Sequence, residues 1–197
     1  MSAVPGHVIS SFFVYSFINA FTPGPGNLLA LNTAAGCGWK KGVPLFLGIF
    51  TGYYAVQLLC ALFVYGVSAF LPEVLEGMRY AGAAYILWLA FRIALSRPDR
   101  DGGEKSASFW KGFVLQFVNV KIYLFGITAL TGYVTGYSTS LWVLVLFELV
   151  IATIGTGATL VWIGAGTAIR SVYLRHFRLA NLILALSLLE CAYSILK

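Results

Sequence analysis

Charged residues are scarce in this sequence. Asp, Glu, Lys and Arg together make up 10% of the 197 residues, whereas 59% of the residues are apolar. A globule surrounded by water needs more polar surface than this composition supplies, so we expect an integral membrane protein. The net charge of +6 does not indicate nucleic-acid binding, because the cations lie between apolar runs rather than on one soluble face.

The sequence also lacks the residue clusters that carry metal, redox or ATP chemistry. Its three cysteines, Cys37, Cys60 and Cys191, form no C-x-x-C pair, and His7 and His176 are isolated from one another. The phosphate loop of an ATP-driven pump, with its Gly-Lys-Ser/Thr element, is absent as well. We therefore expect no metal, no cofactor and no enzymatic activity, and the unpaired cysteines argue against a membrane redox protein.

Six apolar stretches approach the length of a membrane span. Crossing about 30 Å of hydrocarbon takes about 20 apolar residues in a helix. We predict an all-α membrane protein, a single transmembrane domain over residues 1–197, whose six helices lie at about Val8–Thr33, Val43–Phe70, Val74–Leu95, Phe109–Leu130, Leu141–Ala168 and Leu179–Leu196. No cleavage site follows the first apolar stretch, so we expect the first span to be retained.

The chain divides into two halves of three spans. A polar segment at about residues 96–108 separates a first repeat, about 8–95, from a second, about 109–196. Residues Phe13–Asn19 and Phe113–Asn119 share two Phe, one Val and one Asn at an offset of 100, although four matches in an apolar background also arise by chance. Because three spans separate the copies, the second crosses in the opposite sense. We predict an inverted repeat, as in many transporters with alternating access.

The distribution of cations predicts the orientation in the membrane. Lys and Arg concentrate after the first span, around the central loop and before the sixth span. The positive-inside rule makes these segments cytoplasmic, so we expect both termini on the periplasmic side of a bacterial inner membrane. The glycines of the second and fifth spans create narrow helix faces, which are compatible with a homodimer.

The first span contains a run that a continuous helix does not tolerate. This run is Thr22-Pro23-Gly24-Pro25-Gly26-Asn27, and each proline removes a backbone donor and clashes with the preceding turn. We predict a broken helix here. The backbone groups freed inside the bilayer must face protein or a watery cavity, and the new helix N-terminus suits an anion such as a carboxylate. A simple packing kink is the alternative.

The same run resembles the signature of the lysine exporter and homoserine/threonine resistance (LysE/RhtB) family of amino-acid exporters. Further similarities are the segments 82–90 and 108–121, so the resemblance covers nearly the whole chain. Most of the family has Asn-Pro-Lys in the fourth helix, where this chain has Asn119-Val120-Lys121. That version resembles the cysteine/O-acetylserine exporter subgroup. Gly26 stands where this subgroup has Asn, so the exact substrate stays open.

The fourth span carries four polar residues that we predict to contact the substrate. Lys121 lies about 18 Å along this helix, deep in the bilayer, where an ammonium group is costly unless it is paired or hydrated. The alternative is that the Lys121 side chain extends to a membrane interface, where its ammonium group is hydrated. On an undistorted helix Asn119 shares a face with Gln116 and Tyr123, and Lys121 points elsewhere.

Two acids inside apolar spans, Glu148 and Glu190, are the candidates to carry a coupling proton or to pair with Lys121, because burial favours a neutral carboxyl group. The resemblance implies a secondary transporter that exports cysteine, O-acetylserine or another small neutral amino acid. A passive channel or facilitator for small metabolites is the alternative function. The expected partners are therefore the amino-acid substrate and the lipid bilayer.

Overall fold

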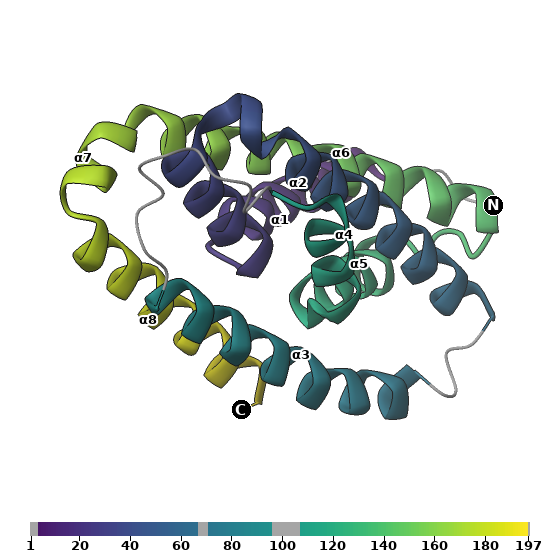
Figure 1. The fold of residues 1–197 in the computed structure, drawn as a ribbon. Coiled ribbons are helices and arrows are strands. Elements are labelled where there is room, and N and C mark those ends of the chain that lie inside the picture. The colour runs from purple at the N-terminus through teal and green to yellow at the C-terminus, as the bar shows by residue number, and fades with distance from the viewer. Residues whose placement is uncertain (1–3, 67–70, 96–106, 197) are drawn as a thin grey trace.

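A computed structural model describes residues 4–66, 71–95 and 107–196, so most of the predicted central loop lies outside the described residues. Every regular element in these ranges is a helix (Figure 1). The helices are α1 (Gly6–Phe21), α2 (Pro25–Gly66), α3 (Leu71–Ala94), α4 (Phe109–Val118), α5 (Val120–Tyr133), α6 (Leu141–Ala168), α7 (Arg170–Arg175) and α8 (Phe177–Leu196).

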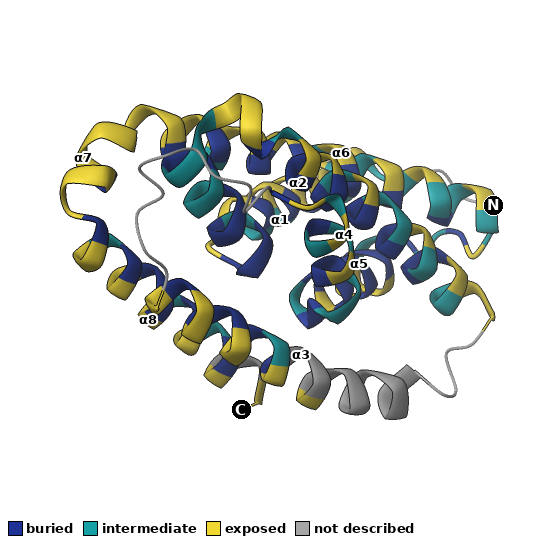
Figure 2. Ribbon diagram, viewed as in Figure 1, coloured by how far each residue is buried: buried dark blue, intermediate teal, exposed yellow. Residues whose placement is uncertain are grey.

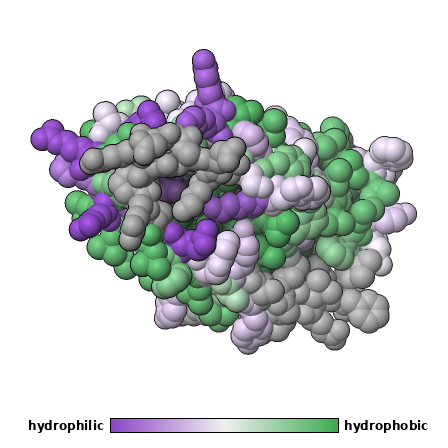
Figure 3. Space-filling view, viewed as in Figure 1, coloured by the Kyte–Doolittle hydropathy of each residue, from purple (hydrophilic) through white to green (hydrophobic). Residues whose placement is uncertain are grey.

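The surface of these helices is apolar enough to face lipid. Within the described ranges, α2 and α6 are long and apolar enough to cross a membrane, and the bent pair of α4 and α5 qualifies as a third span. Many large apolar side chains are exposed, with Trp142 at 80% as an extreme. Hydrophobic residues cover much of the visible face in Figure 3, as expected for a protein solvated by hydrocarbon.

The helical backbone is interrupted between α1 and α2. Thr22 has the extended conformation, with φ −60° and ψ 140°, and Pro25 is the first residue of α2. Proline is well suited to a first helical position, since its ring fixes φ and the missing N–H has no intrahelical partner there. Asn27 then donates from Nδ2 to the carbonyl oxygens of Ala20 at 3.0 Å and Thr22 at 3.3 Å. The side chain of Asn27 therefore satisfies carbonyls that the interruption leaves free.

The structure corrects the boundary between the first two predicted spans. The sequence predicts a connection between Thr33 and Val43, but the helical region α2 runs through it and departs from helical geometry only at Gly38, with φ 82° and ψ 170°. Glycine adopts a positive φ without steric cost, so the direction of the chain changes at one residue instead of in a loop. Pro44 lies inside the following part of α2 without ending the helix.

The fourth predicted span is also divided. Asn119, with φ −84° and ψ 85°, separates α4 from α5, and the two helices meet at 54°. The prediction of one helix over Phe109–Leu130 is therefore wrong in this detail. No proline causes the bend; instead, α4 is held against α2 by a close backbone approach, since a Cβ added to Gly48 would lie 2.0 Å from the Phe109 carbonyl oxygen.

The helices form a bundle with one attached pair. Helices α1, α2, α4, α5 and α6 pack together, while α3 and α8 lie side by side along one flank (Figure 1). In the parts of α3 and α8 whose side chains the structure describes, buried residues alternate with exposed ones (Figure 2), and buried residues of both helices belong to one apolar cluster with residues of α2. The short helix α7, which the sequence did not reveal, connects α6 to α8. Its Tyr173 hydroxyl accepts a hydrogen bond from Asn32 Nδ2 of α2 at 3.0 Å.

Candidate substrate pocket

A pocket lies where the two backbone interruptions face each other. It encloses about 330 Å³ of empty volume, its open mouth included. Polar side chains from α1, α2, α4, α5 and α6 and from the residue between α4 and α5 line it: Asn19, Asn27, Gln116, Asn119, Lys121 and Thr159. Gly24 and Gly26 leave the backbone of the first interruption accessible, and Ala20, Tyr53, Ile122 and Phe125 form the apolar part of the wall.

Lys121 connects the two interruptions directly. Its Nζ donates to the carbonyl oxygen of Thr22 at 2.8 Å and to that of Pro23 at 3.3 Å. Both carbonyls are free because the prolines and the extended backbone end the helical hydrogen-bonding pattern there. A Cβ on Gly24 would lie 3.0 Å from Lys121 Cδ, so glycine allows the lysine stem to pass. The ammonium group is thus partnered inside the protein, and snorkelling to an interface is not needed.

Gln116 and Asn119 form the opposite side of the pocket. A Cβ on Gly26 would lie 3.0 Å from Gln116 Oε1, which places this amide against the first turn of α2. Asn119 Nδ2 donates to the same Oε1 at 3.5 Å. Within the described residues, the buried Asn119 Oδ1 has no hydrogen-bond partner. A buried acceptor of this kind is rare in folded proteins and is suited to a ligand that brings a donor.

Asn27 joins the first interruption to α6. Besides its bonds to the α1 side, its Oδ1 accepts a hydrogen bond from Thr159 Oγ1 at 2.9 Å. The first-turn amides of α2, at Gly26 and Asn27, have no intrahelical acceptor by the geometry of any helix start. The pocket therefore combines the first-turn amides of α2, the Lys121 ammonium group and the unpartnered Asn119 Oδ1 within one small space.

The structure brings together most of the residues predicted from the sequence. Gly24, Gly26, Asn27, Gln116, Asn119 and Lys121 line the pocket, and Thr22 and Pro23 contribute carbonyl oxygens. Pro25 is buried as the first residue of α2. Two expectations are wrong. Lys121 and Asn119 line the same pocket because the bend at Asn119 reorients α5, and Tyr123 lies in a buried apolar cluster instead of the pocket wall.

Three pocket residues with polar groups were not predicted to bind substrate: Asn19, Tyr53 and Thr159. A signal for Asn19 was present, since it corresponds to Asn119 at the offset of 100 residues in the predicted repeat, and both line the pocket. Tyr53 and Thr159 come from the middle of long apolar helices. Their sequence context does not distinguish them from other polar residues in membrane helices.

The two acids occupy different environments. Glu148 on α6 is fully buried, whereas Glu190 on α8 is exposed. The predicted pairing of Lys121 with either acid is wrong: within the described ranges, Lys121 Nζ bonds to backbone carbonyls.

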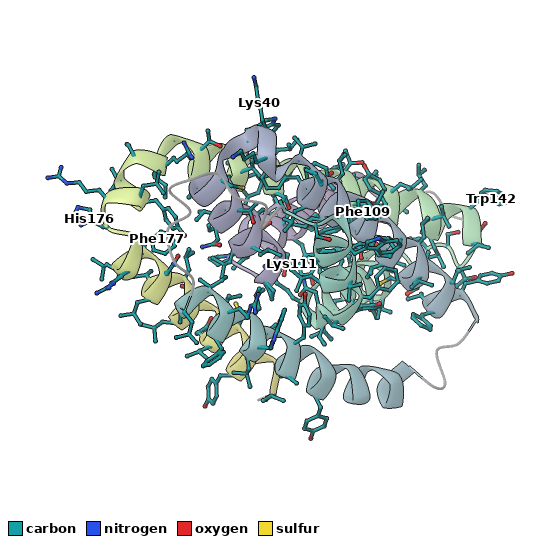
Figure 4. The ribbon with its side chains drawn as sticks, viewed as in Figure 1. Lys40, Phe109, Lys111, Trp142, His176 and Phe177 are labelled. Atoms are coloured by element: carbon teal, nitrogen blue, oxygen red, sulfur yellow. The ribbon has the colours of Figure 1, made fainter. Side chains whose placement is uncertain are left out.

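Hydrophilic residues gather at one end of the molecule. They lie mainly on the side of α7 in Figure 3. In Figure 4, Lys40 and His176 mark this end, and Trp142 lies at the other. Arg170 also lies here, with Nη2 donating to the Gly36 carbonyl oxygen at 3.5 Å.

Comparison with known proteins shows the family. The sequence matches the family described as LysE type translocator over residues 6–196. This chain belongs to the LysE family. It is 39% identical over 189 residues to proteins named "Cysteine/O-acetylserine efflux protein" from Escherichia coli (strain K12), Escherichia coli O139:H28 and Shigella sonnei. The alignments cover 95% of this chain and 97% of each relative. No solved structure matches it.

Membership in the LysE family makes the chain a membrane transporter rather than an enzyme. The resemblance drawn from Thr22-Pro23-Gly24-Pro25 and from the segment around Asn119 is confirmed, and so is the similarity to the cysteine/O-acetylserine subgroup. In this LysE translocator, two of the segments that carry the resemblance, the run Thr22–Asn27 and the segment around Asn119, meet at the pocket.

Proposed function

We propose that this LysE translocator exports cysteine, O-acetylserine or another small neutral amino acid from the cytoplasm across the bacterial inner membrane, in exchange for protons. The observation that carries the proposal is the pocket between two broken helices, bridged by Lys121. Transporters use such discontinuous helices to present backbone groups to substrates in the membrane. The efflux named for the similar proteins supports the choice of substrate.

The pocket has a place for each charge of a zwitterion. The substrate carboxylate would bind at the start of α2, where the amides of Gly26 and Asn27 and the Lys121 ammonium group are donors. The substrate ammonium group would bind to the free Asn119 Oδ1 and to Asn19. The apolar wall, with Ile122 and Phe125, would face a short uncharged side chain. A lysine or arginine substrate would place a second cation near Lys121, which disfavours basic amino acids.

Alternating access follows from the proposed repeat architecture. We propose that the protein has six spans in two inverted halves, about 8–95 and 109–196, and that the first span is broken at Thr22–Pro25. Asn19 and Asn119 occupy corresponding positions and both line the pocket, which supports the repeat. Rocking of one half against the other would expose the pocket to each side in turn.

The proposed orientation places the end with Lys40 and α7 in the cytoplasm and both termini outside. The gathering of hydrophilic residues at that end supports this (Figure 3). In Figure 1 the N-terminus lies at the opposite end of the molecule from α7. A homodimer stays a prediction; Gly157 and Gly164 on α6 have no atom within 4 Å of an added Cβ, so that face is open to a second copy.

Purified full-length protein in liposomes tests the proposal. Uptake of labelled cysteine, O-acetylserine, threonine and lysine is measured with and without an imposed pH gradient. We expect the neutral amino acids, led by cysteine and O-acetylserine, to accumulate above equilibrium only with the gradient. Equilibration without accumulation would instead show a passive facilitator, and transport of none of the four would refute amino-acid export.

A further inference from the structure

A second polar cluster lies inside the bundle, outside the substrate pocket. Glu148 of α6 is fully buried, and in the described part of the chain neither of its carboxylate oxygens has a hydrogen-bond partner. Gln57 of α2 is also fully buried, and its Nε2 is without a partner there. Buried polar groups are nearly always satisfied in native proteins. Two neighbouring groups left unsatisfied therefore indicate a site with a function.

Gly126 of α5 makes room for this cluster. A Cβ added to it would lie 2.9 Å from Glu148 Oε1, 3.0 Å from Glu148 Oε2 and 3.0 Å from Gln57 Oε1. Three helices thus converge on one small polar space. Gln57 Oε1 also accepts a weak hydrogen bond from Cys60 Sγ at 3.7 Å.

The surroundings of Glu148 favour its neutral form. The titratable groups within electrostatic range of Glu148 are Tyr53 and Cys60 of α2. Tyr123 and Tyr133 of α5 and Tyr15 of α1 belong to or pack against the apolar cluster that contains these two residues. None of these is a cation, and no described residue forms an ion pair with Glu148. An ionised carboxylate without a counter-charge is not stable in such an interior. The packing seen here therefore suits the protonated acid.

Tyr53 places this cluster next to the substrate pocket. It lines the pocket, and it precedes Gln57 by one helical turn on the same face of α2. Its side chain lies against α6, since a Cβ on Gly155 would be 2.6 Å from the Tyr53 hydroxyl oxygen. Tyr53 is also within electrostatic range of Glu148. The side chain of Tyr53 thus adjoins both the pocket and the acid.

We propose that Glu148, which lies beside Gln57 and Gly126, is the site that carries the coupling proton, separate from the substrate pocket. This inference rests on the proposed function. When the bundle opens to the outside, the Glu148 carboxylate takes a proton from water and becomes a neutral acid. The neutral acid fits the closed packing, and Gln57 Oε1 is an acceptor for its proton. When the bundle opens to the cytoplasm, the acid returns the proton to water and the carboxylate is restored.

The test uses Glu148→Gln, which keeps the shape of the protonated acid but carries no titratable proton. In liposomes containing the full chain, we expect exchange of labelled for unlabelled cysteine to persist, while accumulation driven by a pH gradient is lost. Glu190→Gln is the matched control, an acid exposed on α8, and we expect it to accumulate cysteine like the unmodified protein. Accumulation by Glu148→Gln, or its loss in Glu190→Gln alone, would overturn the proposal.

A glycine pair on α5 gives a second test that does not alter the acid. Gly126→Ala would push a methyl group against the Glu148 and Gln57 oxygens, whereas Gly132→Ala meets no atom within 4 Å. We expect the pH dependence of cysteine accumulation to shift in Gly126→Ala and to stay unchanged in Gly132→Ala. Equal pH profiles in both variants would contradict the proposed site. Failure of the unmodified protein to transport any amino acid would instead refute the proposed function.

Discussion

The two interruptions that form the pocket differ in their cause. Between α1 and α2, Pro23 and Pro25 exclude a continuous helix, and Thr22–Gly24 are non-helical. Between α4 and α5, the single residue Asn119 departs from helical geometry, with valine rather than proline after it, yet the helices meet at 54°. The first interruption is therefore imposed by local chemistry, and the second is stabilised by contacts with the rest of the protein.

Lys121 is the contact that links the two interruptions. Its Nζ reaches the Thr22 and Pro23 carbonyl oxygens only because the bend at Asn119 turns α5 toward α1. The bend in turn places a cation next to backbone oxygens that the prolines have freed. The break between α1 and α2 thus provides the carbonyl oxygens that bind Lys121, and this contact supports the bend between α4 and α5.

The largest expected effect comes from Lys121→Ala, which removes this link. We expect transport of cysteine to be abolished, because both the proposed donor for the substrate carboxylate and the contact to Thr22 and Pro23 are lost. Membrane insertion should be intact, as judged by the amount of protein in washed membranes. Lys40→Ala, at an exposed position, is the control. Normal transport by Lys121→Ala would show that Lys121 has a structural role and is not needed for transport.

Asn27→Ala tests how far the first interruption depends on side-chain contacts. The variant loses the hydrogen bonds to Ala20, Thr22 and Thr159. We expect about 1–3 kcal/mol less stability, because the partly buried Ala20 carbonyl and the Thr159 hydroxyl lose a partner, while the Thr22 carbonyl keeps the bond from Lys121. Thermal unfolding in detergent measures the effect. Thr159→Val removes only the α6 contact and should cost less; an unchanged melting temperature in Asn27→Ala would show that the prolines alone define this break.

The two asparagines at corresponding repeat positions can be compared directly. Asn119 has a free buried Oδ1, whereas Asn19 Nδ2 is bonded to the Tyr15 carbonyl oxygen within its own helix. We expect Asn119→Ala to raise the half-saturation constant for cysteine about tenfold. This is the effect expected when one hydrogen bond to the charged ammonium group of the substrate is lost. Asn19→Ala should raise it less. Equal effects would indicate that the repeat is functionally symmetric.

The smallest expected effect is that of Val120→Pro, which makes the second interruption resemble the first. Val120 is the first residue of α5, and the ψ of 85° at Asn119 is outside the helical region, as a residue before proline prefers. We expect transport to persist and stability to change by about 0.4–1 kcal/mol, in the stabilising direction. Ile122→Pro, inside α5, is the control and should be severely destabilised. Loss of transport in Val120→Pro would show that this bend must stay flexible.

The sequence predicted the pocket residues more completely at the first interruption, between α1 and α2, than at the second, between α4 and α5. Prolines and glycines act on the backbone locally, so the sequence located the break and the residues around it. Asn119 and Lys121 were recognised as polar residues in an apolar helix, but helical periodicity separated them onto different faces. The bend that unites them depends on packing of α4 against α2 through Gly48, a contact between residues far apart in the sequence. For the same reason, the helical periodicity wrongly placed Tyr123 with the residues that contact the substrate.

The sequence by itself determined that the chain is helical, that it is apolar enough for a membrane and that it is broken at Thr22–Pro25, because composition and proline chemistry act through nearest neighbours. Only the tertiary structure decided which polar groups meet. It brought Lys121 to the Thr22 carbonyl, joined Asn27 to Thr159 and isolated Glu148 beside Gln57. These contacts join residues on different helices, and a polar side chain in an apolar segment does not reveal which neighbour will satisfy it.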